Sequence, residues 1–140
     1  MVFDPLRELP GYALRRASNA SLSELTPKLG KLGLRVTEAT VLIAIKNNPR
    51  ITQSEIGRML GIASANIAPM IGRLDGRDLL KRIRVDGRSH GLELSEKGAD
   101  LTEKAFSVVK KHEEKISSYI PDEIREPFIK ALNKMWADHD

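Results

Sequence analysis

The chain has 140 residues, enough for one globular domain with a sizeable core, and it contains no cysteine, which excludes a disulfide framework, thiol catalysis and a cysteine-ligated zinc site. Its first ninety residues hold 15 Lys and Arg against 8 Asp and Glu, and its last fifty hold 8 against 11, so the net charge of +4 divides into +7 and −3. A basic part of this kind is typical of a surface that meets a polyanion, and ordinary solvated charge explains it equally well. The start lacks the features of a signal peptide and no run is apolar enough for a membrane span, so we expect a soluble cytoplasmic protein with no membrane partner.

Helical periodicity dominates the first fifty residues. Four leucines recur at three- and four-residue spacing, namely Leu22, Leu25, Leu29 and Leu32. This spacing predicts one helix from about residue 11 to about residue 31, which Pro27 should kink or restart. Thr37 is the expected N-cap of a second helix, which is apolar nearly all round and should end at Asn48 and Pro49.

Two further helices follow, with only a short link between them. Thr52 and Glu55 form an S/T-x-x-E capping box, which predicts a helix that begins there and ends at Gly61. The next helical pattern covers residues 64–80, and its apolar stripe consists of Ile67, Met70, Ile71 and Leu74. A short capped helix, a turn and a second amphipathic helix form the helix-turn-helix pattern, whose second helix can enter the major groove of DNA.

The stretch KRIRVDGRSHGLEL, residues 81–94, alternates apolar and polar residues on both sides of an exposed tip, which predicts a two-stranded hairpin. A hairpin directly after a helix-turn-helix makes a winged helix. Its tip would project Arg88 toward the backbone or minor groove of DNA, and Asp86 would hold that guanidinium in place. Taken alone, such a tip is better explained as polar because it is exposed; after a helix-turn-helix, the DNA-binding interpretation is favoured.

The last fifty residues predict two more helices. Ser95 is the expected cap of a long helix over about residues 96–118, and Pro121 is expected at the first position of a final helix, whose first turns Pro127 should disturb. Three aromatic residues of this region are predicted to lie in a dimer core rather than to form a stacking platform, namely Tyr119, Phe128 and Trp136.

Residues 51–98, ITQSEIGRMLGIASANIAPMIGRLDGRDLLKRIRVDGRSHGLELSEKG, resemble the MarR (multiple antibiotic resistance regulator) family. The resemblance runs through the helix-turn-helix, the D-x-R wing motif and the LSEKG that enters the long helix. It implies a mainly α fold with a small β-hairpin wing, in which a winged helix-turn-helix lobe over about residues 35–95 is joined to dimerisation helices at about 1–32 and 96–140 in a single domain. It also implies a homodimeric repressor of a roughly palindromic double-stranded DNA operator, released by a small aromatic or phenolic ligand.

The outward face of the predicted recognition helix departs from the family pattern, because it carries few hydrogen-bond donors: it consists of Ala65, Pro69, Gly72 and Gly76. Small side chains can only let the backbone approach closely or touch thymine methyl groups. Hydrogen-bonded readout would then fall to Asn66, which can pair with adenine, and Arg73, which can pair with guanine. Pro69 would kink a helix capped by Ser64 but would lie in the first turn of a helix capped by Asn66, so we expect an irregular first turn.

These considerations give two sets of candidate site residues. The predicted DNA-binding residues are Ser64, Ala65, Asn66, Pro69, Arg73, Arg77, Arg84, Asp86 and Arg88. For Arg77 and Arg84 the expected contact is with phosphate, and solvated surface charge is an equally good explanation. The resemblance also implies a ligand pocket lined by the first helix, with Tyr12, Arg15, Arg16 and Asn19. For Arg15 and for Arg16, an intersubunit ion pair or simple exposure to water is a better explanation than a contact with a ligand.

Other function classes find little support. HEEKI at His112 lacks the second histidine of H-E-x-x-H, GKLG at Gly30 is no phosphate-binding loop, and no paired carboxylates stand out. We therefore predict no metal, no cofactor and no enzymatic activity. The alternative function is a winged-helix protein-interaction module that binds no specific DNA, which the donor-poor recognition face supports.

Overall fold

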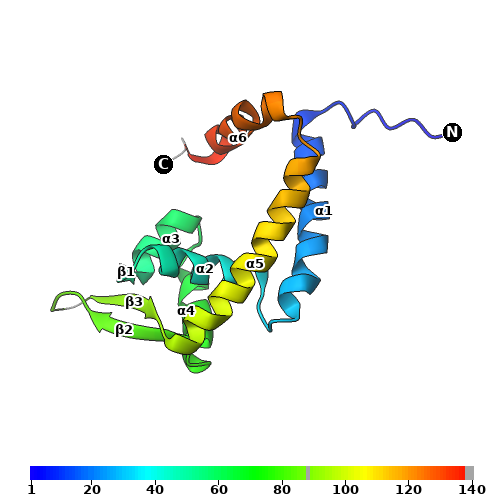
Figure 1. Cartoon of the computed structure of the whole chain (residues 1–140). Coiled ribbons are helices and arrows are strands. Elements are labelled where there is room, and N and C mark those ends of the chain that lie inside the picture. Colours follow the sequence, from blue (N-terminus) through cyan, green and yellow to red (C-terminus); the bar gives the residue numbers. More distant parts are fainter. Residues whose placement is uncertain (88, 138–140) are drawn as a thin grey trace. The chain divides into compact units, whose positions relative to one another are not determined.

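The computed structural model describes residues 1–87 and 89–137 and is mainly helical with a small antiparallel sheet, as expected (Figure 1). Contacts divide the chain into two compact units, Met1–Val108 and Val109–Asp140. No described helix is both long enough and apolar enough to cross a membrane. The elements in chain order are α1 (Pro10–Gly30), α2 (Val36–Asn47), β1 (Ile51–Thr52), α3 (Gln53–Leu60), α4 (Ser64–Gly76), β2 (Leu80–Arg84), β3 (His90–Leu94), α5 (Glu96–Ser118) and α6 (Asp122–Ala137).

The first two helices lie close to their predicted positions, with one correction. α1 continues through Pro27 instead of restarting there. The N-cap of α2 is Arg35, so the prediction of Thr37 was wrong by two residues. The reason is the Glu38 side chain, which reaches back and accepts a hydrogen bond of 2.8 Å from the Arg35 amide, so the helix begins earlier than a hydroxyl cap would allow.

The capping box of α3 is confirmed. The Thr52 amide donates to the Glu55 carboxylate at 3.0 Å, and the Glu55 amide donates to the Thr52 hydroxyl at 3.2 Å. Gly61 ends the helix as predicted, with a left-handed φ of 66°. Both ends of α3 are therefore specified by residues within the helix or next to it.

The start of α4 differs from both alternatives left open by the sequence. Ala63 is the N-cap, and its carbonyl accepts hydrogen bonds from the Asn66 and Ile67 amides at 2.9 and 3.0 Å. α4 is a continuous α-helix through Pro69, so the irregular first turn that we expected is absent. It ends at Gly76, before residue 80, because Asp78 adopts a φ of 60° and breaks the helical path.

The sheet has three strands rather than the two that were predicted. β2 and β3 pair from Leu80 with Leu94 to Arg84 with His90, and β1 adds to the other edge of β3 through Ile51 and Leu92. A strand of two residues leaves no alternation in the sequence, which is why β1 was missed. In Figure 1 the β2–β3 hairpin extends beyond α3 and α4 as an arm.

The first turn of α5 is fixed to the segment between α4 and β2. The Ser95 amide donates to the Leu79 carbonyl at 3.0 Å, and the Ser95 hydroxyl donates to the Asp78 carbonyl at 2.6 Å. The same hydroxyl accepts the Gly98 amide at 2.9 Å, which confirms Ser95 as the cap. A Cβ atom at Gly98 would lie 2.0 Å from the Leu79 carbonyl oxygen, so only glycine fits there.

Each element of the first unit contributes at least one buried apolar side chain to the core. Five that are less than 2% exposed are Leu29 of α1, Leu42 of α2, Ile56 of α3, Ile71 of α4 and Leu92 of β3. In the second unit, α6 begins at Asp122 and not at Pro121, and it continues through Pro127. The Arg125 guanidinium caps the end of α5 by donating to the Ser117 and Ile120 carbonyls at 3.1 and 2.8 Å.

Gly98→Ala should destabilise the protein by about 3 kcal/mol, because the added methyl group collides with a backbone oxygen that cannot move aside cheaply. Gly30→Ala is the matched control, since a Cβ atom there meets nothing within 4 Å and alanine favours the helix by about 0.5–1 kcal/mol. Urea unfolding measures both free energies. Equal effects of the two substitutions would contradict the tight packing at Gly98.

Glu55→Gln should reduce stability in a pH-dependent way. The Thr52 amide, and after it the Thr52 hydroxyl, lowers the pKa of Glu55 below its ordinary value of 4.5. A carboxylate whose folded pKa is depressed stabilises the fold above its unfolded pKa, and this contribution is lost as the pH falls through the folded pKa. The difference in unfolding free energy between wild type and variant should therefore be present at neutral pH and disappear in acid.

Urea unfolding at a series of pH values from 7 to about 3 measures this difference. Glu103→Gln is the control, because it removes one exposed negative charge of α5 without touching a helix cap. A difference for Glu55→Gln that stays constant with pH would contradict the role of the carboxylate charge.

Candidate nucleic-acid interface

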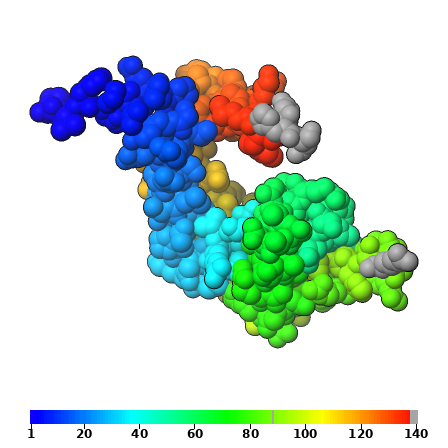
Figure 2. Space-filling model, turned by 180° about the vertical axis from the view of Figure 1, so that it is seen from behind, coloured from blue at the N-terminus to red at the C-terminus, as the bar shows by residue number. Residues whose placement is uncertain are grey.

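The structure places a helix, a turn, a second helix and a hairpin in succession on one lobe. α3 and α4 are joined by residues 61–63, and the hairpin follows α4 after a short turn. In Figure 2 the green surface that includes α4 faces the viewer, and the yellow-green hairpin projects beside it. A protruding helix flanked by a projecting hairpin is the geometry by which winged helices engage the major groove and its neighbour.

The predicted readout face of α4 is exposed along its length. Its buried stripe is the predicted one, and the opposite side leaves Ser64, Ala65, Asn66, Pro69 and Gly72 exposed. Among the described residues, no side chain lies within 4 Å of a Cβ atom built at Gly72. The structure thus brings these candidates together on one exposed, donor-poor face of α4, with the Asn66 amide at its N-terminal end.

Two arginines predicted to contact DNA have partners inside the chain. Arg77 is half-buried, and its Nη1 donates to the Gly33 carbonyl at 2.7 Å. Arg73 is 45% exposed, and its Nε lies 3.8 Å from the Glu38 carboxylate, which is almost completely buried. Arg77 therefore contacts the loop between α1 and α2, and Arg73 contacts the first turn of α2.

The wing carries a free cation at its outer end. Arg84 is exposed, and its guanidinium has no partner among the described residues. The tip is closed by two hydrogen bonds, from the Val85 amide to the Ser89 carbonyl at 3.1 Å and from the Ser89 amide to the Asp86 carboxylate at 2.8 Å. Asp86 thus has a structural role in the turn, whereas Arg88 and its predicted pairing with Asp86 lie outside the described residues.

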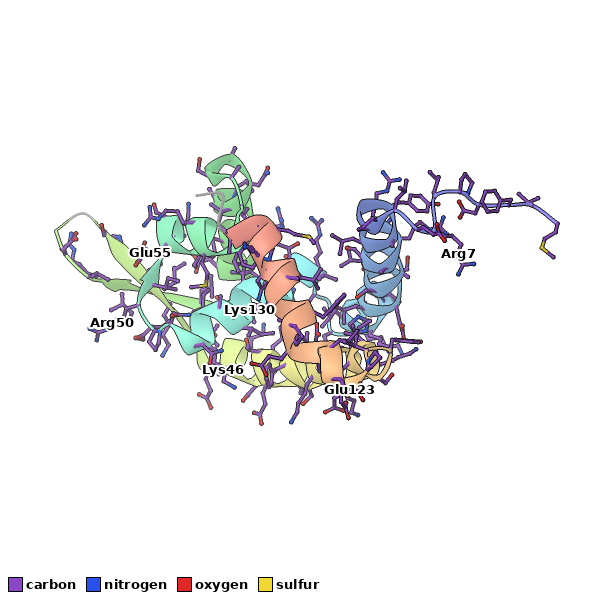
Figure 3. All side chains as sticks on the ribbon, turned by 90° about the horizontal axis from the view of Figure 1, so that it is seen from above. Arg7, Lys46, Arg50, Glu55, Glu123 and Lys130 are labelled. Carbon is purple, nitrogen blue, oxygen red and sulfur yellow. The ribbon has the colours of Figure 1, made fainter. Side chains whose placement is uncertain are left out.

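Two further cations near α3 were missed. Arg50 and Arg58 line a shallow groove beside the start of α3, and Figure 3 shows Arg50 beside the hairpin, directed outward. Arg50 pairs with Glu93 at 3.5 Å and adopts a φ of 67°, which the sequence does not reveal. The net positive charge of the first ninety residues was the only indication of Arg50 and Arg58 in the sequence.

The ligand candidates on α1 lie on one side of that helix. Arg16 donates to the Tyr12 hydroxyl at 3.0 Å, and the Arg15 guanidinium lies 5.4 Å from the centre of the Tyr12 ring. Asn19 is exposed about one turn further along. The described residues therefore bring Tyr12, Arg15 and Arg16 together. Within the described part of the chain, no group of three or more His, Asp and Glu side chains is arranged to hold a metal ion.

Comparison with known proteins supports the winged-helix assignment. The model of the MarR family matches residues 32–89. The organic hydroperoxide resistance transcriptional regulator of Bacillus subtilis (strain 168) is 28% identical over 99 residues, which cover 69% of this chain and 67% of that protein.

Solved structures extend the similarity over the whole chain. The transcriptional repressor CouR bound to a 23-mer DNA duplex is 30% identical, with coverage of 96% of this chain and 97% of CouR and a TM-score of 0.85. CouR bound to p-coumaroyl-CoA is also 30% identical, with coverage of 100% and 99% and a TM-score of 0.84. The chain therefore belongs to the MarR family of winged helix-turn-helix, DNA-binding transcriptional regulators, which are not enzymes.

Proposed function

We propose that this protein is a homodimeric repressor that binds a roughly palindromic operator and is released by a small aromatic or phenolic ligand. The observation that carries the proposal is the exposed face of α4 beside a wing whose Arg84 is free among the described residues. Phosphate contacts supply much of the affinity of such proteins, and base contacts supply the selectivity. Arg84 and Arg88 fit the first role, and the α4 face fits the second.

Recognition by α4 rests on shape and methyl contacts more than on hydrogen bonds. Ser64 and Asn66 are the exposed donors of its first turn, and Asn66 can pair with the edge of adenine. Ala65, Pro69 and Gly72 present no donor, so this part of the helix suits close approach to thymine methyl groups. The proposed operator is therefore rich in A·T pairs where the middle of α4 lies.

The dimer is supported by the apolar surface of α6. No residue of α6 is buried, and Phe128, Met135 and Trp136 are 41%, 53% and 64% exposed. An amphipathic helix with its apolar side uncovered is stabilised when it packs against a second copy. Two recognition helices of such a dimer would lie about one DNA turn apart, roughly 34–36 Å.

The proposed effector site is on α1. Tyr12 supplies an aromatic face, and Arg15 and Arg16 supply two cations beside it, an arrangement that suits an aromatic acid. The similarity to CouR, which was solved with p-coumaroyl-CoA, supports an aromatic ligand class. Intersubunit ion pairs of the same arginines are the alternative, and a ligand titration of the protein–DNA complex distinguishes the two.

Binding to the promoter region of the protein's own gene tests the function. Fluorescence anisotropy of the full chain, over about 50–200 mM salt, should show tighter binding to this duplex than to a scrambled one and a steep salt dependence. Arg84→Met and Arg88→Ala should each lower the log–log slope by about 0.9 for every phosphate that the protein no longer neutralises. Lys104→Met, which removes an exposed charge of α5, is the control.

Equal and weak binding to both duplexes, with no effect of the wing variants, would favour the alternative function. The chain would then be a winged-helix protein-interaction module, in which the donor-poor α4 face contacts another protein. The two functions thus differ in salt dependence as well as in selectivity.

Gly72→Ala separates stability from recognition on the α4 face. The substitution should stabilise the protein by about 0.5–1 kcal/mol, since Gly72 lies inside a helix and a Cβ atom there meets nothing within 4 Å. It should weaken operator binding at least about fivefold, or about 1 kcal/mol, because the methyl group holds the helix away from the bases. Gly30→Ala makes the same chemical change on α1 and should leave binding unchanged; unchanged binding by Gly72→Ala would place this face outside the groove.

A further inference from the structure

A hydrogen bond joins the recognition helix to the loop that follows α1. Arg77 follows the last residue of α4, and its Nη1 donates to the Gly33 carbonyl at 2.7 Å across 44 positions of sequence. The side chain is half-buried, which limits the directions in which its guanidinium can point. A hydrogen bond from a charged donor is stronger than a neutral one, so this contact restrains the end of α4.

The acceptor is held in place by the end of α1. The Leu34 amide donates to the Leu29 carbonyl and the Gly33 amide to the Gly30 carbonyl, which is the pairing of a Schellman motif. Gly33 has a φ of 70°, and a Cβ atom there would lie 3.3 Å from Arg77 Nη2. The direction of the Gly33 carbonyl is therefore set by α1, and the absence of a side chain leaves room for Arg77.

A second contact joins α4 to the first turn of α2. One oxygen of Glu38 accepts the Arg35 amide at 2.8 Å, and the other lies 3.8 Å from Arg73 Nε. Glu38 is only 5% exposed, and a carboxylate buried to that extent is stabilised by the charged partner. Arg73 lies one helical turn before Arg77, so both contacts hold the same side of α4.

The backbone of this junction is held from α5. Lys97 donates to the Arg77 carbonyl at 3.1 Å, so the backbone of Arg77 is restrained while its side chain holds the loop. Because both the backbone and the side chain of Arg77 are restrained, a displacement of the α1–α2 loop is transmitted to the end of α4. The loop continues directly from α1, which carries the proposed effector residues.

We infer that Arg77, with Arg73, is a positioning residue that couples the α1–α2 loop to the orientation of the recognition helix, rather than a contact to phosphate or guanine. This inference rests on the proposed DNA-binding function. A change in α1 would reach α4 through the Arg77–Gly33 hydrogen bond and the Arg73–Glu38 ion pair. The two arginines would then affect operator affinity without touching DNA.

Arg77→Met and Arg77→Lys test the inference in full-length protein with operator and scrambled duplexes. Loss of the hydrogen bond should lower operator affinity about 2- to 30-fold, the range for a substitution along a coupling contact, and leave the salt slope and the binding to scrambled duplex unchanged. Lysine retains a donor for the Gly33 carbonyl and should restore part of the affinity. Arg84→Met is the matched control for a true phosphate contact, with a slope lower by about 0.9.

The outcomes separate the competing roles. A lower slope and equal losses on both duplexes would make Arg77 a phosphate contact, and unchanged operator affinity at a temperature where circular dichroism shows a folded variant would make its role purely structural. Either result overturns the inference while leaving the proposed function intact. Failure of the wild-type protein to select the operator overturns both.

A double-mutant cycle gives an independent readout should Arg77→Met not fold. Glu38→Gln and Arg73→Met should weaken operator binding non-additively, because each removes the same ion pair. If Arg73 instead reads guanine, its effect should remain complete in the Glu38→Gln background. An additive cycle would therefore overturn the positioning role of Arg73.

Discussion

The Leu79 carbonyl and the residues packed against it determine how the recognition helix, the wing and the long helix meet. Its oxygen accepts the Ser95 amide, and the absence of a side chain at Gly98 lets the first turn of α5 approach it. The Leu79 amide in turn bonds to the Leu74 carbonyl at the end of α4. Three elements thus meet at one residue, which explains why a serine and a glycine three positions apart begin α5. The serine caps the helix, and the glycine leaves room for the Leu79 carbonyl in the segment before β2.

This junction also fixes the position of the wing relative to the recognition helix α4. Asp75 near the end of α4 pairs with Arg82 of β2 at 3.3 Å, so the base of the wing is held to the recognition helix. Arg84, two residues further along β2 than Arg82, is exposed. Because α4 and the wing are tied at their common end, the positions of a base contact on one and a phosphate contact on the other are not independent. In the proposed function, this constraint fixes the spacing between the groove that α4 enters and the phosphates that the wing contacts.

Local signals explain what the sequence could predict, and distant contacts explain what it could not. The capping box of α3, the Ser95 cap of α5 and the leucine spacing of α1 involve residues three or four apart, so α1, α3 and the start of α5 were found almost to the residue. The start of α4 depends on Ala63, which has no capping side chain, and β1 exists only because Leu92 lies beside Ile51. The intrachain partner of Arg77 could not be predicted, because Gly33 lies 44 residues away in the sequence, where charge patterning gives no information.

Three glycines show the difference between a residue that the fold requires and one that it does not. Gly98 is required by the Leu79 carbonyl, and Gly33 by a left-handed φ beside Arg77. Gly72 meets neither condition, although it lies in the middle of a helix, where it costs about 1 kcal/mol relative to alanine. Among the described residues, nothing lies within 4 Å of a Cβ atom built at Gly72, so the fold itself does not require glycine there. In the proposed function, the missing methyl group lets DNA approach the backbone of α4 closely, which is a role for Gly72 outside the fold.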